Sequence, residues 1–227
     1  MSESSLSAPS ADAFVPSERS RLRRLHERGQ YDRAAVHAVL DAGTLAHVGY
    51  VVDGQPYVTP TLYWRDGDRL YWHGSSASRM LRTVKQGTPV CLTVSHLDGI
   101  VVARSGFHCS VNYRSVMAFG TARAIEDEAE KEAVLRDFVD GLMPGRWAEM
   151  RPPTAQELKG TTVVWMDMEE AAAKVRSGPP KDDEEDYALA CWAGVVPVRT
   201  VLGAPEDDPR LAAGIPVPDS VRGIRLG

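Results

Sequence analysis

Residues 44–73 read TLAHVGYVVDGQPYVTPTLYWRDGDRLYWH, and this stretch decides the fold. It holds three runs rich in β-branched and aromatic residues, at 44–52, 55–64 and 69–73, which are typical of strands. Asp53-Gly54 and Asp66-Gly67 separate the runs, and Asp-Gly favours the tight turn of a hairpin. The stretch therefore predicts three antiparallel strands joined by short turns.

Further strands and inserted helices are predicted on either side. Helices are expected from Asp32 to Gly43, from the serines at 75–78 to Gly87, and from Asp127, which with Glu130 resembles a capping box, to about Gly141. Strands are expected at 89–95, at 100–103 after a turn at Asp98-Gly99, and at 116–125, 161–168 and 193–202. Loop and short helix are expected at 144–160, and a charged, exposed loop at 178–187. An open antiparallel sheet of this size would expose its edges, so we predict a mainly β protein with a few helices whose strands close into a barrel.

Composition excludes several classes of protein. The 227 residues carry 26 Lys+Arg against 31 Asp+Glu, which leaves no bulk cationic excess for nucleic acid. Hydrophobic residues make up 43% and charged residues 25%, an ordinary globular composition rather than a disordered or collagen-like one. No apolar run approaches the ~20 residues of a membrane span, and the N-terminus lacks a secretory signal pattern. The three cysteines, Cys91, Cys109 and Cys191, are widely spaced and odd in number, so we expect reduced thiols in a cytoplasmic protein.

The chain divides into one large domain with terminal segments. Residues 1–17 are rich in Ser, Ala and Pro and predict a disordered tail. Residues 18–29 carry five arginines and predict a basic arm or helix. A solvated helix or a strap on a partner subunit is favoured over a nucleic-acid contact. Residues 30–202 form the predicted barrel domain, and residues 203–227 a C-terminal extension.

Several well-known catalytic motifs are absent from the sequence. It contains no P-loop, no glycine-rich dinucleotide fingerprint, no HExxH and no GxSxG. The six histidines form no recognisable ligand spacing with one another or with cysteine, so no metal site is predicted. The remaining candidates for a functional site are polar residues at the ends of the predicted strands.

The strand-to-helix junction from His73 to Arg79 is the first such place. Its sequence, HGSSASR, puts small and hydroxyl residues where a helix begins. Helix N-termini present unpaired N–H groups that suit a phosphate, and Ser78 and Arg79 add a hydroxyl and a guanidinium. A helix that is merely capped by serine explains the same residues, and both interpretations stay open.

Two other groups of residues are candidates for a binding site. Asn112-Tyr113-Arg114-Ser115 precede an apolar strand and could form the lip of a site, although composition alone favours a loop with a charged strand end. Lys174 and Arg176 follow Trp165, and Trp192 comes later. Tryptophans can wall a planar aromatic ligand whose anionic edge such cations reach, while core tryptophans with surface charge are the alternative.

Five motifs occur in a telling order: Pro60-Thr61-Leu62-Tyr63, Leu70-Tyr71-Trp72-His73-Gly74, Ser78-Arg79-Met80-Leu81, Tyr113-Arg114-Ser115-Val116 and Phe119-Gly120. With them, residues 30–202 resemble the pyridoxamine 5′-phosphate oxidase-like FMN-binding split-barrel superfamily, most closely the branch of 5-nitroimidazole resistance and flavin-nucleotide-binding proteins. The resemblance implies a six-stranded split barrel, a homodimer, and an FMN in each of two clefts at the subunit interface.

The resemblance also assigns residues. Thr59 to Tyr63 match the strand whose backbone faces the flavin ring edge, and His73, Gly74 and Ser75 match the strand end beside the ribityl chain and phosphate. Ser78 and Arg79 match the pair that grips the phosphate. Arg114 and Ser115, with the adjoining Asn112 and Tyr113, match a group reaching FMN from the second subunit. Arg176 and Trp192 are candidates for the C-terminal Arg and Trp near the ring.

The sequence departs from the oxidases themselves in two places. Met80 replaces the lysine that follows Ser-Arg, and Trp192 is followed by Ala193-Gly194 rather than by the Arg-x-His substrate motif. Pyridoxamine phosphate oxidation is therefore not expected. The sequence predicts an FMN-dependent oxidoreductase acting on a small molecule, with His73 as a possible proton donor. The alternative is a non-catalytic protein that binds flavin or haem, and a deazaflavin is the third cofactor considered.

Overall fold

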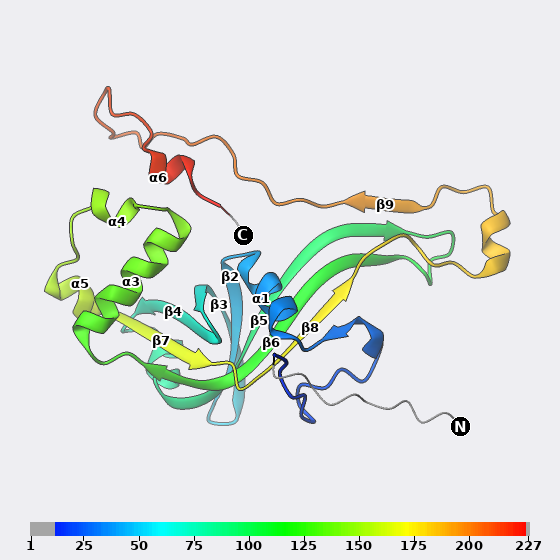
Figure 1. The fold of residues 1–227 in the computed structure, drawn as a ribbon, viewed down its shortest axis with the longest axis horizontal. Coiled ribbons are helices and arrows are strands. Elements are labelled where there is room, and N and C mark those ends of the chain that lie inside the picture. The colour runs from blue at the N-terminus through cyan, green and yellow to red at the C-terminus, as the bar shows by residue number, and fades with distance from the viewer. Residues whose placement is uncertain (1–11, 226–227) are drawn as a thin grey trace.

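A closed ring of six antiparallel strands forms the body of the molecule (Figure 1). The computed structural model describes residues 12–225. In ring order the strands are β2 (Leu45–Val52), β3 (Gln55–Asp66), β4 (Arg69–Ser75), β7 (Thr161–Asp167), β6 (Ser110–Ala124) and β5 (Gln86–Val102). Each strand pairs with the next, and pairing of β5 with both β6 and β2 closes the ring. The predicted antiparallel barrel is confirmed.

Beyond the barrel, β5 and β6 continue side by side as a long hairpin (Figure 1). Strand β8 (Glu170–Arg176) pairs with β6, β1 (Gly29–Gln30) pairs with β8, and β9 (Gly194–Pro197) pairs with the far half of β5. The predicted turn at Asp98-Gly99 is wrong, because these residues form an irregularity inside β5, where Val195 and the Val196 carbonyl approach Gly99 closely. The last predicted strand, 193–202, is limited to the four residues of β9.

Strand β8 is not predicted by the sequence, whereas the helix starts are. β8 reads EAAAKVR, and its alanines carry no strand signal, so the sequence reading assigned no strand there. The predicted helix starts are confirmed: a carboxylate oxygen of Asp32 accepts from the Ala35 N–H, and one of Asp127 from the Glu130 N–H, both at 2.8 Å. The helices are α1 (Arg33–Asp41), α2 (Arg79–Val84), α3 (Glu128–Leu142), α4 (Arg146–Glu149), α5 (Ala155–Gly160) and α6 (Asp219–Arg222), with 3₁₀ turns η1 (His26–Arg28) and η2 (Glu184–Ala188). None of the helices described is long and apolar enough to span a membrane.

The molecule has two separate apolar layers. The inner one fills the barrel with fully buried side chains such as Leu40, Trp72, Leu92 and Val116. The outer one lies where α3 covers the outside of β4 and β7, with Tyr71 and Val163 packed under Val134 and Leu135. The second layer determines the surroundings of His73, described below.

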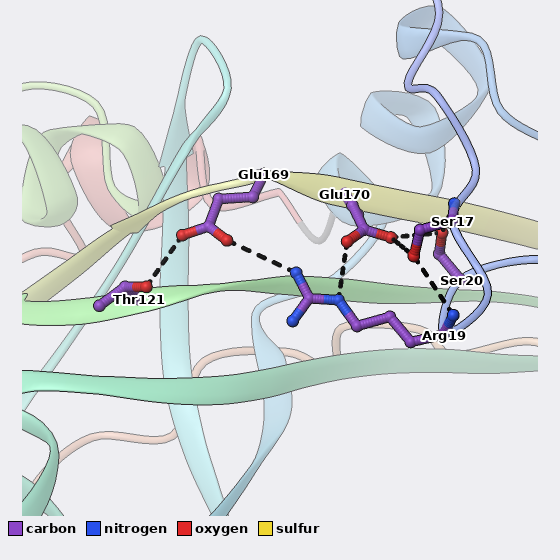
Figure 2. Close-up of polar contacts among 6 residues, drawn as sticks. All are labelled: Ser17, Arg19, Ser20, Thr121, Glu169 and Glu170. Carbon is purple, nitrogen blue, oxygen red and sulfur yellow. Dashed lines mark hydrogen bonds and ion pairs between the residues drawn. The ribbon is translucent and has the colours of Figure 1, made fainter.

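The N-terminal segment is fastened to the barrel. Phe14 is 3% exposed and belongs to the inner core. Figure 2 shows Ser17, Arg19 and Ser20 converging on Glu170, while Arg19 also reaches Glu169 at 3.5 Å. The expected tail at 1–17 therefore packs against the barrel over residues 12–17, because Phe14 finds a place in the core. Residues 1–11 lie outside the described residues. Residues 18–29 form turns and η1 rather than a longer helix.

The carboxylate of Glu170 holds this segment. Hydrogen bonds from Ser17 and Ser20 and the guanidinium of Arg19 lower its pKa to about 2. A carboxylate with a lowered pKa in the folded state stabilises the fold above its unfolded pKa and loses that contribution as the pH falls.

We therefore expect Glu170→Gln to lower the melting temperature at pH 7 but to lose its effect as the pH falls from about 4.5 to about 2. Circular dichroism melts of both proteins between pH 2 and pH 7 measure this. An equal difference in melting temperature at pH 7 and pH 2.5 would contradict the role of the Glu170 charge.

Gly120 marks the place where β6 passes from one neighbour to another. A Cβ atom built there would lie 2.2 Å from the carbonyl oxygen of Asp167. β6 pairs with β7 through Arg123 and Ala124, and with β8 up to Phe119, so the end of β7 must cross close to Gly120. The crossing needs a residue without a side chain.

Gly120→Ala should cost about 1–3 kcal/mol of stability, because backbone must move to admit the methyl group. The measurement is the free energy of unfolding in urea. Gly106→Ala is the matched control, since nothing lies within 4 Å of a Cβ built at Gly106. Equal stability of the two variants would show that the crossing adapts without strain.

Candidate functional site

Strand β3 exchanges partners along its length, and this opens the barrel on one side. Gln55–Leu62 pair with β2, whereas Tyr63–Asp66 pair with β4. The end of β4, His73–Ser75, pairs only with β7 among the strands described. Two strand edges therefore diverge from Tyr63 without bonding to each other. Their free N–H and C=O groups are available to a ligand.

The first turn of α2 lies at the end of β4. Ser75 is exposed, and its hydroxyl accepts from the Ala77 N–H at 3.2 Å. Ser78 is the N-cap residue, but its side chain caps no N–H group of the helix. Arg79 is exposed and lies over the Tyr57 ring at 5.4 Å. No carboxylate in the described part of the chain pairs with Arg79, so this guanidinium is available to an anion.

The predicted residues of β3 face two ways. Thr59 and Thr61 are half-buried, and Tyr63 lies in the core, where its hydroxyl donates to the Leu40 carbonyl. Burial raises the pKa of Tyr63 strongly. Pro60 and Leu62 are exposed on the outer face. The backbone of this segment therefore borders the opening along its whole length. Its side chains lie instead toward the core or on the outer surface.

The second predicted group lies on β6 and β8. Arg114 makes a two-pronged ion pair with Asp98, with both N···O distances 2.9 Å. Arg176 donates to the Asn112 side-chain oxygen at 2.5 Å, and the Asn112 amide donates to the Gly178 carbonyl at 3.1 Å. Tyr113 and Ser115 are half-buried neighbours on the same strand. In the described residues no hydrogen bond or ion pair links this group to Arg79. Within one chain, the structure thus separates cations that the sequence reading assigned to one ligand.

The predicted tryptophan wall does not form within one chain. Trp165 lies under the Arg69 guanidinium at 3.9 Å and packs in the outer layer, away from Trp192. Trp192 is 66% exposed, and its ring lies against Gly194. Lys174 donates to the Arg24 carbonyl at 3.4 Å. The acidic loop at 178–187 is partly held down, since Asp182 accepts from the backbone and the side chain of Arg104.

His73 lies under helix α3, in the outer apolar layer. Its ring centroid is 5.1 Å from that of Phe138 and 5.8 Å from that of Trp64. Its Nδ1 atom is buried and has no hydrogen-bond partner. Burial lowers the pKa of His73, so the imidazole is neutral near pH 7. A neutral imidazole with unused nitrogens can bind a metal centre or accept a proton.

A cavity of about 340 Å³ adjoins this aromatic cluster. Trp64 and Phe138 line it together with Leu40 and Leu142, and its charged lining residues are Asp41, Arg65 and Arg225. Sequence reading missed Trp64 and Phe138 as site residues. Phe138 lies within the predicted helix, but nothing in the sequence indicates that this helix covers β4.

The other five histidines have different surroundings. His37, His96 and His108 are each engaged by a carboxylate or a carbonyl, at 2.9–3.2 Å. His26 and His47 are exposed. In the part of the chain described, no cluster of His, Cys, Asp and Glu could hold a bare metal ion. Among the described residues, His73 is thus the one histidine with a buried ring nitrogen that has no hydrogen-bond partner.

Comparisons with known proteins agree with this architecture. A family model described as pyridoxamine 5′-phosphate oxidase matches residues 32–175. The flavocytochrome Anf3 from Azotobacter vinelandii is 50% identical, with a TM-score of 0.89 over 94% of this chain and 100% of that one. An FAD- and haem-binding protein from Mycobacterium smegmatis is 41% identical, with a TM-score of 0.83 over 87% of this chain and 97% of that one. A comparison with curated sequences gave no match.

A more distant structure shares the fold alone. A protein described as conferring 5-nitroimidazole resistance, from Bacteroides thetaiotaomicron, is 21% identical, with a TM-score of 0.53 over 65% of this chain and 86% of that one. The family model covers more than half of the chain, and the ring of strands with its open edge is observed directly. This chain belongs to the pyridoxamine 5′-phosphate oxidase-like flavin-binding split-barrel family.

Proposed function

We propose that the protein is a redox protein that binds a flavin nucleotide and a haem. The observation that carries the proposal is His73, a half-buried, neutral histidine whose buried Nδ1 atom is unused, in a chain 50% identical to a flavocytochrome. The flavin is FMN or FAD; the sequence resemblance points to FMN, and the Mycobacterium smegmatis relative is described as binding FAD.

The flavin is assigned to the opening between β3 and β4. The free backbone edge of Gln55–Leu62 offers N–H donors to the ring, and Arg79 and Ser78 offer a guanidinium and a hydroxyl to a phosphate. Donors fixed at the ring edge favour the anionic, reduced form of a flavin. Met80 stands where relatives of the oxidase type carry lysine, so Arg79 takes a larger share of the phosphate charge.

A second copy of the chain completes the site in this proposal. The outer face of β2 and β3 brings Leu45 opposite Leu62 and Val51 opposite Pro56, and all four side chains are exposed. Val58 on the same face is 68% exposed. An apolar face of this kind favours protein contact. In a homodimer, Arg114, Ser115 and Asn112 of one chain would serve the flavin of the other.

The residues around His73 fit a haem. The fit rests on the orphaned Nδ1 atom, on the aromatic walls of Trp64 and Phe138, and on the adjoining cavity with two arginines in its lining. His73 would hold the iron, and Arg65 and Arg225 would pair with carboxylates of the porphyrin. Arg65 already forms an ion pair with Asp41, which keeps its guanidinium in place.

Both cofactors together define the expected chemistry. Flavin exchanges two electrons and haem exchanges one, so a protein with both can pass electrons between two-electron and one-electron partners. The chain itself orients the groups, excludes water from His73 and keeps that imidazole neutral. A protein that binds these cofactors without turnover is the alternative, and reduction by NADH or NADPH under anaerobic conditions distinguishes the two.

The absorbance spectrum of the purified protein tests the assignment of His73. We expect flavin bands and a Soret band in the native protein, and loss of the Soret band in His73→Gly because the iron loses its ligand. Added imidazole should restore the band. His47→Gly is the control, since His47 is an exposed strand histidine. A Soret band that survives in His73→Gly would remove His73 from the proposal. A colourless native protein would overturn the function.

Arg79→Ala should weaken flavin binding by about 10–100-fold, because a charge-assisted bond to phosphate contributes about 1.5–3 kcal/mol. Fluorescence quenching of the flavin on titration into apo-protein gives the dissociation constant. Arg82→Ala, an exposed arginine of the same helix, should change it little. Equal affinities of the two variants would mean that the phosphate lies elsewhere.

A further inference from the structure

The segment that follows β9 stands away from the barrel. We define residues 198–218 as the C-terminal arm. At one end the Val198 N–H donates to the Asp98 carbonyl at 3.1 Å. At the other end, just past the arm, the Ser220 hydroxyl donates to Glu149 at 2.7 Å, and Ser220 is 3% exposed. Figure 1 shows the arm running from β9 to α6 along one side of the molecule.

Between these two anchors the first part of the arm has little support from its own chain, whereas the part from Pro205 onward lines a cavity of about 500 Å³ together with Arg146 and Glu149 of α4. Every residue from 199 to 216 is exposed. Within the described residues, the hydrogen bonds of this stretch are confined to one turn, from Asp208 to Leu211. An extended segment without stabilising contacts does not hold a single conformation, because ordering it costs conformational entropy.

The arm nevertheless carries large apolar side chains. Val201 is 77% exposed and Leu202 is 52% exposed, and Val196 at the root of the arm is 49% exposed. Prolines at 197, 205, 209, 216 and 218 favour an extended backbone with little freedom to collapse. These features suit a segment that lies along the surface of another molecule.

A relative provides a second, independent observation. The match to the flavocytochrome from Azotobacter vinelandii covers 94% of this chain with a TM-score of 0.89. The unmatched 6% is about 14 of the 227 residues, fewer than the arm contains, so the match extends into the arm. The two sequences are 50% identical. At least part of the arm thus belongs to the fold that the two proteins share.

We infer that the arm clamps a second copy of this chain, with Val201 and Leu202 packed on the other subunit. The occupant is a second copy because the arm starts at the edge of the β5–β6 hairpin, whose Leu97 and Ile100 are also about half exposed. The apolar surfaces of the arm, the hairpin and the β2–β3 face then serve one interface. The inference rests on the homodimer of the proposed function.

Sedimentation velocity of the cofactor-loaded, full-length protein over a range of concentrations tests the clamp. Wild type is expected to be a dimer. The double variant V201E/L202E should raise the dimer dissociation constant about tenfold or more, since it places two charges in an apolar contact. Val15→Glu is the control, because Val15 is a 66% exposed valine in the N-terminal segment. Far-UV circular dichroism checks that all three proteins are folded.

Hydrogen exchange supplies a second readout. Amides of the arm should be protected in the dimer and should lose protection on dilution to monomer. A V201E/L202E protein that dimerises as wild type does would overturn the clamp and leave the homodimer intact. A wild type that stays monomeric would overturn both. Protection of the arm that does not depend on concentration would place it on its own barrel and also overturn the clamp.

Discussion

The partner exchange of β3 is the constraint on which the site depends. β3 bonds to β2 through Leu62 and to β4 from Tyr63 onward, so the strands on its two sides separate at this point. The ring stays closed because β4, β7, β6 and β5 continue the pairing around the barrel. The barrel therefore opens at this point, although each of its strands remains paired over part of its length. Tyr63 secures the branch point, since its ring is buried and its hydroxyl is bonded to Leu40 of helix α1.

A second apolar layer outside the barrel gives the molecule an unusual place for a histidine. α3 covers β4 and β7, and His73 comes to lie between this helix and the sheet. Desolvation keeps its imidazole neutral, and no polar neighbour satisfies Nδ1. An unpaired buried polar atom is costly, so a structure retains one where a ligand or a reaction uses it.

The surface combines exposed apolar side chains with arginines that are paired within the chain. The outer face of β2 and β3, the hairpin and the C-terminal arm all expose large apolar side chains, whereas several arginines are already paired with carboxylates. Arg19 is used to hold the N-terminal segment, and Arg114 is bound to Asp98. Arg79, without a carboxylate partner, differs from these arginines. A near-neutral chain can in this way offer one local site for an anion.

The sequence by itself determined the antiparallel strands, the hairpin turns and the starts of α1 and α3, because alternation, Asp-Gly turns and Asp caps are local signals. It also indicated Arg79 and His73 as residues of interest. Only the tertiary structure decided that Asp98-Gly99 bends a strand instead of ending it, that the alanines of β8 form a strand, and that Phe138 covers His73. Each of these depends on contacts between residues far apart in the chain, and a local pattern carries no record of which distant surface will desolvate a side chain.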